Sequence, residues 1–277
     1  MASPLEDELG DILQKARDGR NWSQKDLAQA VGISVSDIVR AERYEWIPAE
    51  DQVAAMAAAL NLDAATLWAI AQDRYVPEPV EADPGFDMTC LEVFMGAYPV
   101  KCYLATCPET GESAVVDTGA NPEALIKTVR EKNVRVTHIL LTHNHPDHAW
   151  GLGKLDAEFQ CPAWVGANEP KPGGSHDLRR AQEGDTLTVG RMTVDVLSTP
   201  GHTAGGVSYK INRTVFSGDC IFAGSMGRAN SSWQDLFESI TTRLLSFPED
   251  TRLLPGHGPA TTVGGEKTHN PFFRGRC

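Results

Sequence analysis

The sequence predicts an α+β protein in which a small all-helical domain precedes a larger sandwich of sheets and helices. Residues 5–73 show the helical spacing of apolar side chains, whereas the chain from residue 85 onward alternates short apolar runs with turns that contain Gly or Pro. Between them, residues 76–84 carry three prolines and three acidic residues without periodicity. We therefore expect domains at 1–75 and 85–277, joined by an extended linker at 76–84.

Length, composition and charge limit the function classes. The chain has 277 residues, of which 41% are hydrophobic, and a formal net charge of −12 at pH 7. That charge argues against broad affinity for nucleic acids or anionic membranes, which need clustered Lys and Arg. The N-terminus lacks the pattern of a signal peptide, and no apolar run approaches the roughly 18–20 residues of a membrane span. We expect a soluble, cytoplasmic protein, whose six cysteines are mainly reduced because they form no C-x-x-C pair.

Two short helices joined by a tight turn are predicted within the N-terminal domain. Ser23 is a good N-cap for a helix over residues 24–30, and Ser34 caps a further helix that extends to about Arg43. The intervening turn contains Gly32, which gives the shape of a helix-turn-helix. The segment W-S-Q-K-D-L-A-Q-A-V-G-I-S, which ends at Ser34, resembles the lambda-repressor-like helix-turn-helix family.

Two kinds of role stay open for this domain. Residues 1–75 contain seven Lys and Arg against thirteen Asp and Glu, so the domain would meet DNA phosphates with an excess of six negative charges. Asp37 falls early in the helix that members of the family place in the major groove, although Gln24, Lys25 and Arg40 could still contact DNA. We expect a structural, dimerising or partner-docking module, for example in a homodimer, and keep operator binding as the less favoured alternative.

Short strands and amphipathic helices are expected in the second domain. The strands are apolar, β-branched runs bounded by turns, and the helices show helical spacing of apolar residues. Strand-rich halves that each contain helices indicate two packed sheets with helices outside, an αββα sandwich. In chain order we expect strands at 91–94, 101–106, 113–117 and 136–141, a hairpin at 186–197, strands at 207–211, 214–216 and 252–254, and helices at 121–132, from about 148 towards 155, and at 233–245.

A dense cluster of metal-binding side chains follows the fourth expected strand. His143, His145, Asp147 and His148 lie within six residues, although the chain has only eight histidines. Pro146 is incompatible with a helix interior, so we expect the cluster on a loop at the strand end. Imidazole and carboxylate are ligands that zinc, iron and manganese select, which makes a polar loop of exposed histidines the less favoured alternative.

Three further loops after expected strands each contain one residue of the metal-binding type. They carry His202, Asp219 and His257 in the segments T-P-G-H-T, S-G-D-C and P-G-H-G. Each segment is weak alone, because a lone histidine or aspartate in a loop is more often solvated or hydrogen-bonded. Together with the first cluster they give seven side chains, enough for two metal ions with three protein ligands each and open positions for water.

The pattern H-x-H-x-D-H, followed by His202, Asp219 and His257, resembles the metallo-β-lactamase superfamily over residues 85–277. The resemblance implies an αββα metallo-β-lactamase sandwich. Two further segments, F-S-G-D-C-I-F-A-G-S-M-G-R and L-P-G-H-G-P-A-T-T-V-G-G-E, contain Asp219 and His257. They are similar to the glyoxalase II group, closest to its short members that lack an extra C-terminal helical domain.

The resemblance also implies two metal sites with a shared ligand. Two divalent metal ions are expected, with zinc first and iron or manganese as alternatives. The implied ligands are His143, His145 and His202 for one ion, Asp147, His148 and His257 for the other, and Asp219 as the bridge between them.

Further roles are implied by the same resemblance. Asp147 would help to orient the attacking water and is the expected catalytic residue. Asp117 matches a carboxylate that orients a ligand histidine, although a turn-capping role is compatible with its V-D-T-G setting. Arg228 matches a basic position that binds substrate. Asp219 stands where zinc β-lactamases carry a cysteine, so hydrolysis of β-lactams is not expected.

These roles predict the hydrolysis of a thioester, like a hydroxyacylglutathione, or of a related activated ester by metal-bound hydroxide. Two cations lower the pKa of water from about 15.7 towards 7 and then stabilise the oxyanion. Two alternatives stay open: a persulfide dioxygenase with one ferrous ion on His143, His202 and Asp219, and a transcriptional regulator whose metal domain senses a ligand. Because every candidate metal ligand lies after residue 140, we expect the N-terminal domain to be dispensable for the chemistry.

Overall fold

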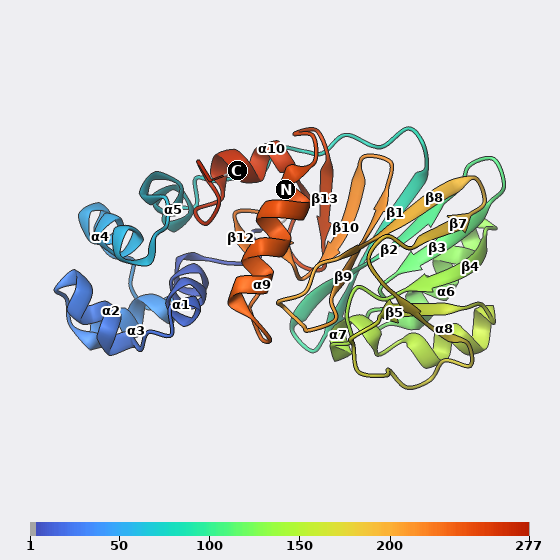
Figure 1. The fold of residues 1–277 in the computed structure, drawn as a ribbon, viewed down its shortest axis with the longest axis horizontal. Helices are drawn as coiled ribbons and strands as arrows, with labels where there is room; N and C mark the ends of the chain where they lie inside the picture. Colours follow the sequence, from blue (N-terminus) through green and yellow to red (C-terminus); the bar gives the residue numbers. More distant parts are fainter. Residues whose placement is uncertain (1–3, 277) are drawn as a thin grey trace.

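The computed structural model describes residues 4–276, with a helical N-terminal domain followed by a mixed domain that contains two large sheets (Figure 1). The expected α+β class is confirmed. A π-helical segment (Ser239–Arg243) and a 3₁₀ turn (Leu244–Ser246) continue α9. The helices are α1 (Leu9–Gly19), α2 (Gln24–Val31), α3 (Val35–Glu42), α4 (Glu50–Leu60), α5 (Ala64–Ala71), α6 (Pro122–Lys132), α7 (Pro146–Ala149), α8 (Leu152–Phe159), α9 (Trp233–Glu238) and α10 (Val263–His269).

Local sequence signals explain the helix ends in the N-terminal domain. Ser23 and Ser34 are the N-caps of α2 and α3, as expected, and their hydroxyl groups accept hydrogen bonds from the backbone N–H groups of Asp26 and Asp37. Gly32 ends α2 in the left-handed conformation, with a φ angle of 73°, which allows the tight turn between the two helices. The helix-turn-helix shape expected from the sequence is therefore present.

Two six-stranded sheets form the second domain, together with the small hairpin β11-β12. The first sheet has the order β1-β2-β3-β4-β5-β6, with antiparallel pairs up to β3 and parallel pairs beyond it. The second has the order β14-β13-β10-β9-β8-β7, in which β10 and β13 are parallel and the other pairs antiparallel. The strands are β1 (Asp87–Met95), β2 (Tyr98–Thr106), β3 (Glu112–Val116), β4 (Arg135–Leu140), β5 (Ala163–Gly166), β6 (Leu178–Ala181), β7 (Thr186–Val189), β8 (Met192–Ser198), β9 (Val207–Ile211), β10 (Thr214–Gly218), β11 (Ile221–Phe222), β12 (Ser225–Met226), β13 (Arg252–Pro255) and β14 (Thr261–Thr262).

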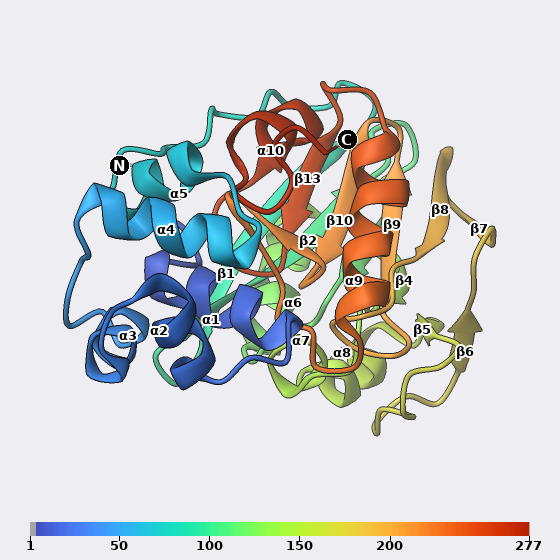
Figure 2. The same cartoon turned by 60° about the vertical axis from the view of Figure 1, so that its left-hand side comes forward.

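The two sheets pack face to face, which confirms the αββα sandwich. Buried side chains from both sheets, including Tyr103, Val116, Tyr209 and Phe216, form one apolar cluster between them. Helices α6 and α8 contribute to a second cluster on the outer face of the first sheet. Helix α9 covers the outer face of the second sheet (Figure 2). Neighbouring strand residues point to opposite faces, so Val215 joins the outer cluster while Phe216 joins the inner one.

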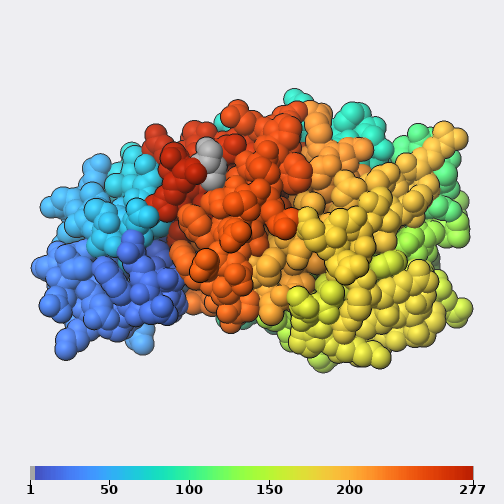
Figure 3. Space-filling model, viewed as in Figure 1, coloured from blue at the N-terminus to red at the C-terminus, as the bar shows by residue number. Residues whose placement is uncertain are grey.

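The helical domain packs on the same side as α9 and shares its core. The apolar cluster that contains Ile12 and Leu13 of α1 also contains Leu236 of α9 and Val215 and Leu253 of the second sheet. In Figure 3 the blue and cyan helical domain is in direct contact with the orange and red C-terminal segments. One apolar core therefore spans both parts of the chain, whereas the dispensability of the N-terminal domain for the chemistry stays a prediction.

Some expectations about local structure need correction. Pro146 is the first residue of α7, so Asp147 and His148 lie on a short helix and not on a loop. Proline is compatible with that position, because its missing N–H would have no partner in the first helical turn. The helix expected to start near His148 is split into α7 and α8. The helix expected at 233–245 is an α-helix only in its first half.

The structure bears on membrane spans and on the state of the cysteines. Within residues 4–276, each helix is too short or too polar to cross a membrane. The five described cysteines are free, as expected for reduced thiols, and four of them are buried. The exposed one is Cys90, and Cys277 lies outside the described residues.

Candidate metal centre

The seven candidate ligands come together at one edge of the sandwich, close to the carboxyl ends of strands. Because β10 and β13 are parallel neighbours, the loops that follow them leave the second sheet at the same edge. Strand β4 of the first sheet ends at this edge too, and the histidine cluster begins at His143, three residues after the end of the strand. The positions are His143 and His145 after β4, Asp147 and His148 in α7, His202 after β8, Asp219 after β10 and His257 after β13.

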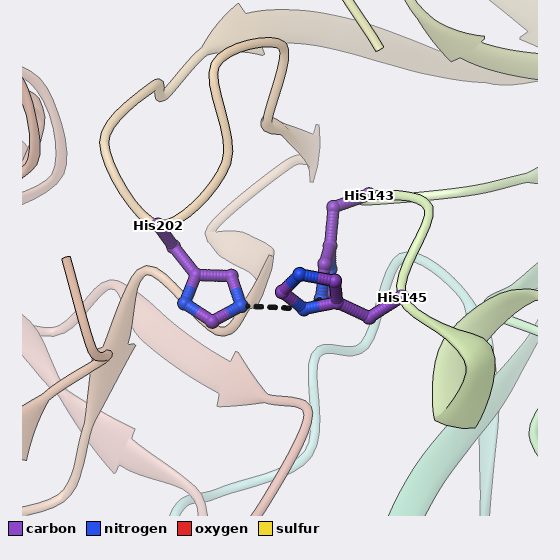
Figure 4. A group of neighbouring side chains, drawn as sticks. All are labelled: His143, His145 and His202. Carbon is purple, nitrogen blue, oxygen red and sulfur yellow. Dashed lines mark hydrogen bonds between the residues drawn. The ribbon is translucent and has the colours of Figure 1, made fainter. Parts of the chain in front are cut away.

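Three of these histidines face one another with ring nitrogens in contact (Figure 4). The Nδ1 atom of His145 lies 3.0 Å from Nε2 of His143 and 2.9 Å from Nε2 of His202. Figure 4 shows that His143 and His145 come from one loop, whereas His202 approaches from a facing loop. Three imidazole nitrogens that converge in this way form a donor set for a metal ion.

Asp147, His148 and His257 form a second group, whose donor atoms lie within 4.8 Å of one another. Asp147 Oδ2 is 3.2 Å from His257 Nε2 and 3.6 Å from His148 Nε2. Asp219 lies between the two groups. Its Oδ1 is 3.3 Å from His148 Nε2, and its Oδ2 is 3.6 Å from His202 Nε2 and 3.5 Å from His257 Nε2. One carboxylate is therefore close to members of both groups.

Backbone carbonyl groups fix the orientation of two of the histidines. His202 Nδ1 lies 2.7 Å from the carbonyl oxygen of Arg228, and His257 Nδ1 lies 2.6 Å from that of Pro99. A carbonyl oxygen only accepts a hydrogen bond, so Nδ1 carries the hydrogen in both rings. Each ring then turns Nε2 towards the centre, the atom that a ligand histidine with this tautomer uses.

Asp117 holds a third histidine of the centre. His148 Nδ1 donates to Asp117 Oδ2 at 2.8 Å, and the same carboxylate accepts hydrogen bonds from the backbone N–H and the hydroxyl group of Thr142, both at 2.8 Å. The carboxylate is almost fully buried and connects α7 with the loop that begins at Thr142. The geometry is that of the orienting contact expected from the sequence, and its effect on metal binding stays a prediction.

Burial and neighbouring charges give the ligands different protonation preferences. Burial lowers the pKa of His143 well below its usual value. Burial acts in the same direction on His148, but Asp219 and Asp117 outweigh it and raise its pKa to about 10. Burial also opposes ionisation of Asp219, yet His148 and His257 hold its pKa well below the usual value. The centre thus favours a positive charge beside ionised carboxylates, and a metal cation can take the place of a bound proton.

The donor set fits divalent metal ions. Within residues 4–276, Asp219 Oδ1 is a buried atom without a hydrogen bond. The ring nitrogens of the first group converge, with His145 Nδ1 lying 2.9 to 3.0 Å from the other two. A buried carboxylate oxygen without a hydrogen bond costs free energy, and a cation bound to it removes that cost. Imidazole nitrogen together with carboxylate oxygen suits zinc, iron or manganese.

One buried carboxylate at the centre was not expected from the sequence. Glu169 accepts hydrogen bonds from the backbone N–H groups of Asn144, at 3.0 Å, and Gly205, at 3.2 Å. Asn144 separates the candidate ligands His143 and His145, and Gly205 lies three residues after His202 in the chain. Glu169 therefore ties two ligand loops together, although no motif in its segment marks it.

The helical domain contacts segments next to the centre at two places, which the sequence did not indicate. Arg228, the expected substrate-binding residue, donates through its guanidinium group to Gln14 at 2.9 Å and to Asp18 at 3.3 Å, both on α1. The segment before α1 approaches the loop that carries the last ligand. A Cβ atom added at Gly258 would lie 2.9 Å from the backbone nitrogen of Glu6.

Comparisons with known proteins agree with the division of the chain into two kinds of structure. A family model described as Metallo-beta-lactamase superfamily matches residues 95–257, and a Helix-turn-helix domain model matches residues 8–69. The hydroxyacylglutathione hydrolase GloC of Haemophilus influenzae is 29% identical over 206 residues, which cover 64% of this chain and 97% of the relative.

Solved structures are similar to the second domain. The B3 metallo-beta-lactamase BLEG-1 is 30% identical with a TM-score of 0.60, and the match covers 68% of this chain and 100% of that chain. The TTHA1623 protein, solved in a di-iron-bound form, is 33% identical with a TM-score of 0.57, and the match covers 66% of this chain and 99% of that chain.

Proposed function

Because the chain belongs to the metallo-beta-lactamase superfamily, we propose that its second domain is a metal-dependent hydrolase that cleaves a thioester or a related activated ester. The observation that carries this proposal is the position of Asp219 between two three-residue donor groups. A carboxylate close to both groups supports a centre with two metal ions. The similarity to a hydroxyacylglutathione hydrolase supports a thioester as the substrate class.

In the proposed reaction the metal ions would activate the water, and the Asp147 side chain would orient it. Divalent cations held by these residues would lower the pKa of water towards 7 and polarise a carbonyl oxygen. Asp147 lies at the open side of the centre, since its side chain is 26% exposed, compared with 10% for Asp219. Burial opposes its ionisation, but hydrogen bonding to His257 outweighs burial and lowers its pKa. The ionised Asp147 carboxylate accepts a hydrogen bond from the attacking water and orients it towards the substrate.

A thioester suits this arrangement because of its leaving group. The thiol that departs has a pKa near 8.5, so its thiolate leaves without protonation by a strong acid. The side chains of the two donor groups and Asp219 are carboxylates and imidazoles that would bind the cations, and none of them has to supply a proton in this step. Their task is to hold the reacting water and the carbonyl carbon in the right geometry, which is a large part of catalysis.

The test is the cleavage of S-lactoylglutathione by the metal-loaded full chain. Wild-type protein should cleave it, and Asp147→Ala should lower the rate on the order of 10²-fold or more, because the oriented water is lost. Asp177→Ala, which removes an exposed carboxylate paired with Arg179 in the same domain, is the matched control. Circular dichroism spectra of the variants establish that the fold persists.

Two other outcomes would redirect the assignment. Oxygen uptake with glutathione persulfide after anaerobic ferrous loading, without any thioester cleavage and unaffected by Asp147→Ala, would identify a dioxygenase that uses one iron. Hydrolysis of a chromogenic cephalosporin faster than of S-lactoylglutathione would favour the activity named for the similar B3 enzyme.

A further inference from the structure

A buried ion pair holds the segment before α1 against the second domain. Asp7 and Lys15 pair with each other, and both side chains are almost fully buried. Lys15 also donates a hydrogen bond to the carbonyl oxygen of Met226 at 2.7 Å, and its Nζ atom lies 5.0 Å from the centre of the Phe222 ring. That ring lies 6.1 Å from the ring of His257. The residues next to Asp7 are therefore fixed close to the metal centre.

Glu6 lies beside the loop that carries the last candidate ligand. A Cβ atom added at Gly258 would lie 3.0 Å from the Cβ atom of Glu6 and 2.9 Å from its backbone nitrogen. Gly258 directly follows His257 in the chain. Any larger residue at this position would force the two segments apart, so the close approach of Glu6 depends on a glycine.

The Glu6 carboxylate lies within electrostatic range of two candidate ligands. Its side chain is half-buried, and within residues 4–276 it has no hydrogen-bond or ion-pair partner. Burial raises the pKa of Glu6 to about 7. Of its charged neighbours, His257 acts on this pKa most strongly and lowers it, ahead of the adjacent Asp7, while Asp219 raises it. An acidic group without a partner thus lies next to the metal centre at the cost of its own hydration.

A cation in the centre would supply the missing partner for this charge. Two divalent ions bring four positive charges, whereas Asp147 and Asp219 are the two carboxylates among the seven candidate ligands. A further carboxylate nearby stabilises the bound cations, and partial burial strengthens the interaction. Asp7 and Lys15 compensate each other, so Glu6 is the charge that this segment adds beside His257.

We infer that Glu6 is a further carboxylate of the metal centre, supplied by the helical domain, which stabilises the metal ion at the second group of candidate ligands, the one that contains His257. It acts through space on the bound cation and is not one of its ligands. The inference rests on the metal-binding part of the proposed function and does not depend on the substrate. It gives the helical domain a role in setting the affinity of one metal site.

Zinc binding to full-length variants with one intact donor group tests this inference. His145→Ala leaves the second group intact, and His257→Ala leaves the first group intact. Glu6→Gln keeps the size of the side chain but removes its charge. It should weaken zinc binding about tenfold in the His145→Ala protein, but less than about threefold in the His257→Ala protein, because Glu6 lies beside the loop of the second group. Competition with a zinc chelator at pH 8 measures both affinities.

Further variants separate the charge of Glu6 from a structural role. Glu6→Asp keeps the charge and should bind zinc within about threefold of the His145→Ala parent. Glu8→Gln removes an exposed carboxylate two residues away and should leave the affinity unchanged. Without metal at pH 8, the ionised Glu6 carboxylate is unfavourably buried, so Glu6→Gln should be at least as stable as its parent in urea unfolding. A purely structural role would instead lower the stability of the metal-free protein.

The outcomes that contradict the inference are distinct from those that contradict the metal centre. Equal zinc affinities of the His145→Ala protein with and without Glu6→Gln would overturn the inference, and so would an equal loss in both backgrounds. Tighter binding in Glu6→Gln would overturn it as well, since the segment would then compete with the metal ion. Absence of zinc binding by both parent variants would reject the proposed metal centre, and the inference with it.

Discussion

The metal centre and the junction between the two domains differ in how the chain builds them. The centre gathers polar side chains from several loops of one domain, and most of its ligands lie in short glycine- or proline-containing motifs. The junction is mainly apolar and joins both ends of the chain, for example Leu13 of α1 with Leu236 of α9 and Phe272 near the C-terminus. A chemical site can therefore be contained in one domain while the stability of that domain depends on another.

Removing the helical domain should have the largest effect. A fragment that starts at Pro84 would expose apolar residues that α1 and the neighbouring helices cover, among them Trp233 and Phe272. Each large apolar side chain is worth about 1.5–3 kcal/mol of burial, and a domain has only about 5–15 kcal/mol of net stability. We expect the fragment to lose its native fold, measured by circular dichroism and gel filtration against the full chain.

A fragment that folds would contradict this expectation. If the fragment binds metal and retains the turnover of the full chain, the helical domain is a separable module after all, and the shared core contributes little to stability.

Loss of single ligands should affect the centre without unfolding the protein. His145→Ala and His257→Ala each remove one side chain from a different donor group, so each should lower the number of zinc, iron or manganese ions bound per chain. Activity should fall on the order of 10²-fold or more, because the ions activate the reacting water. Elemental analysis of protein purified without added metal measures the ratio. His176→Ala, an exposed histidine outside the centre, should keep the wild-type ratio.

The sequence predicts those features of the fold and the site that depend on residues a few positions apart in the chain. Ser23 and Ser34 were identified as helix caps because a cap acts on residues three positions away. His143 is a candidate ligand from the sequence because two further histidines and an aspartate lie within the five residues after it. Short elements such as β5 and α10 were missed, since four to seven residues carry little periodicity.

Long-range contacts could not be predicted in this way. Gln14 and Arg228 are 214 residues apart in the chain, and each is unremarkable in its own segment. Their contact exists because the apolar face of α1 packs on the second domain, and apolar periodicity predicts a buried face without naming its partner. The role of Glu169 could not be predicted either, because its partners are backbone N–H groups of two loops that are distant from it in the chain.

Asp117 should have a smaller effect than the ligands themselves. Asp117→Asn keeps the shape of the side chain but weakens the acceptor that orients His148, so metal affinity should fall about 10- to 100-fold. Competition with a chelator measures this change. Asp156→Asn is the matched control, because Asp156 accepts a hydrogen bond of the same 2.8 Å length from His176 away from the centre. Equal affinities of the wild-type protein and Asp117→Asn would leave Asp117 as a purely structural residue.

The smallest effect on metal binding is expected at Glu266, a residue of α10 beside the junction whose effect is on stability. Its buried carboxylate accepts hydrogen bonds from the N–H of Gly224 at 3.0 Å, the hydroxyl of Thr261 at 2.7 Å and the amide of Asn270 at 2.7 Å. Burial nevertheless raises its pKa to about 7, from an ordinary value of 4.5. The folded state therefore holds this proton more tightly than the unfolded chain does.

The pH dependence of stability follows from that difference. Below pH 4.5 the carboxyl group is protonated in both states and costs nothing. Between pH 4.5 and 7 the unfolded chain loses the proton first, so the folded state loses stability as the pH rises, by about 3 kcal/mol in total. Glu266→Gln does not titrate. Relative to this variant, wild-type protein should be most stable at pH 5 and least stable at pH 8 in urea unfolding at saturating metal. Glu249→Gln, at an exposed glutamate, should follow the wild-type profile, whereas parallel profiles for wild-type and Glu266→Gln would contradict the raised pKa.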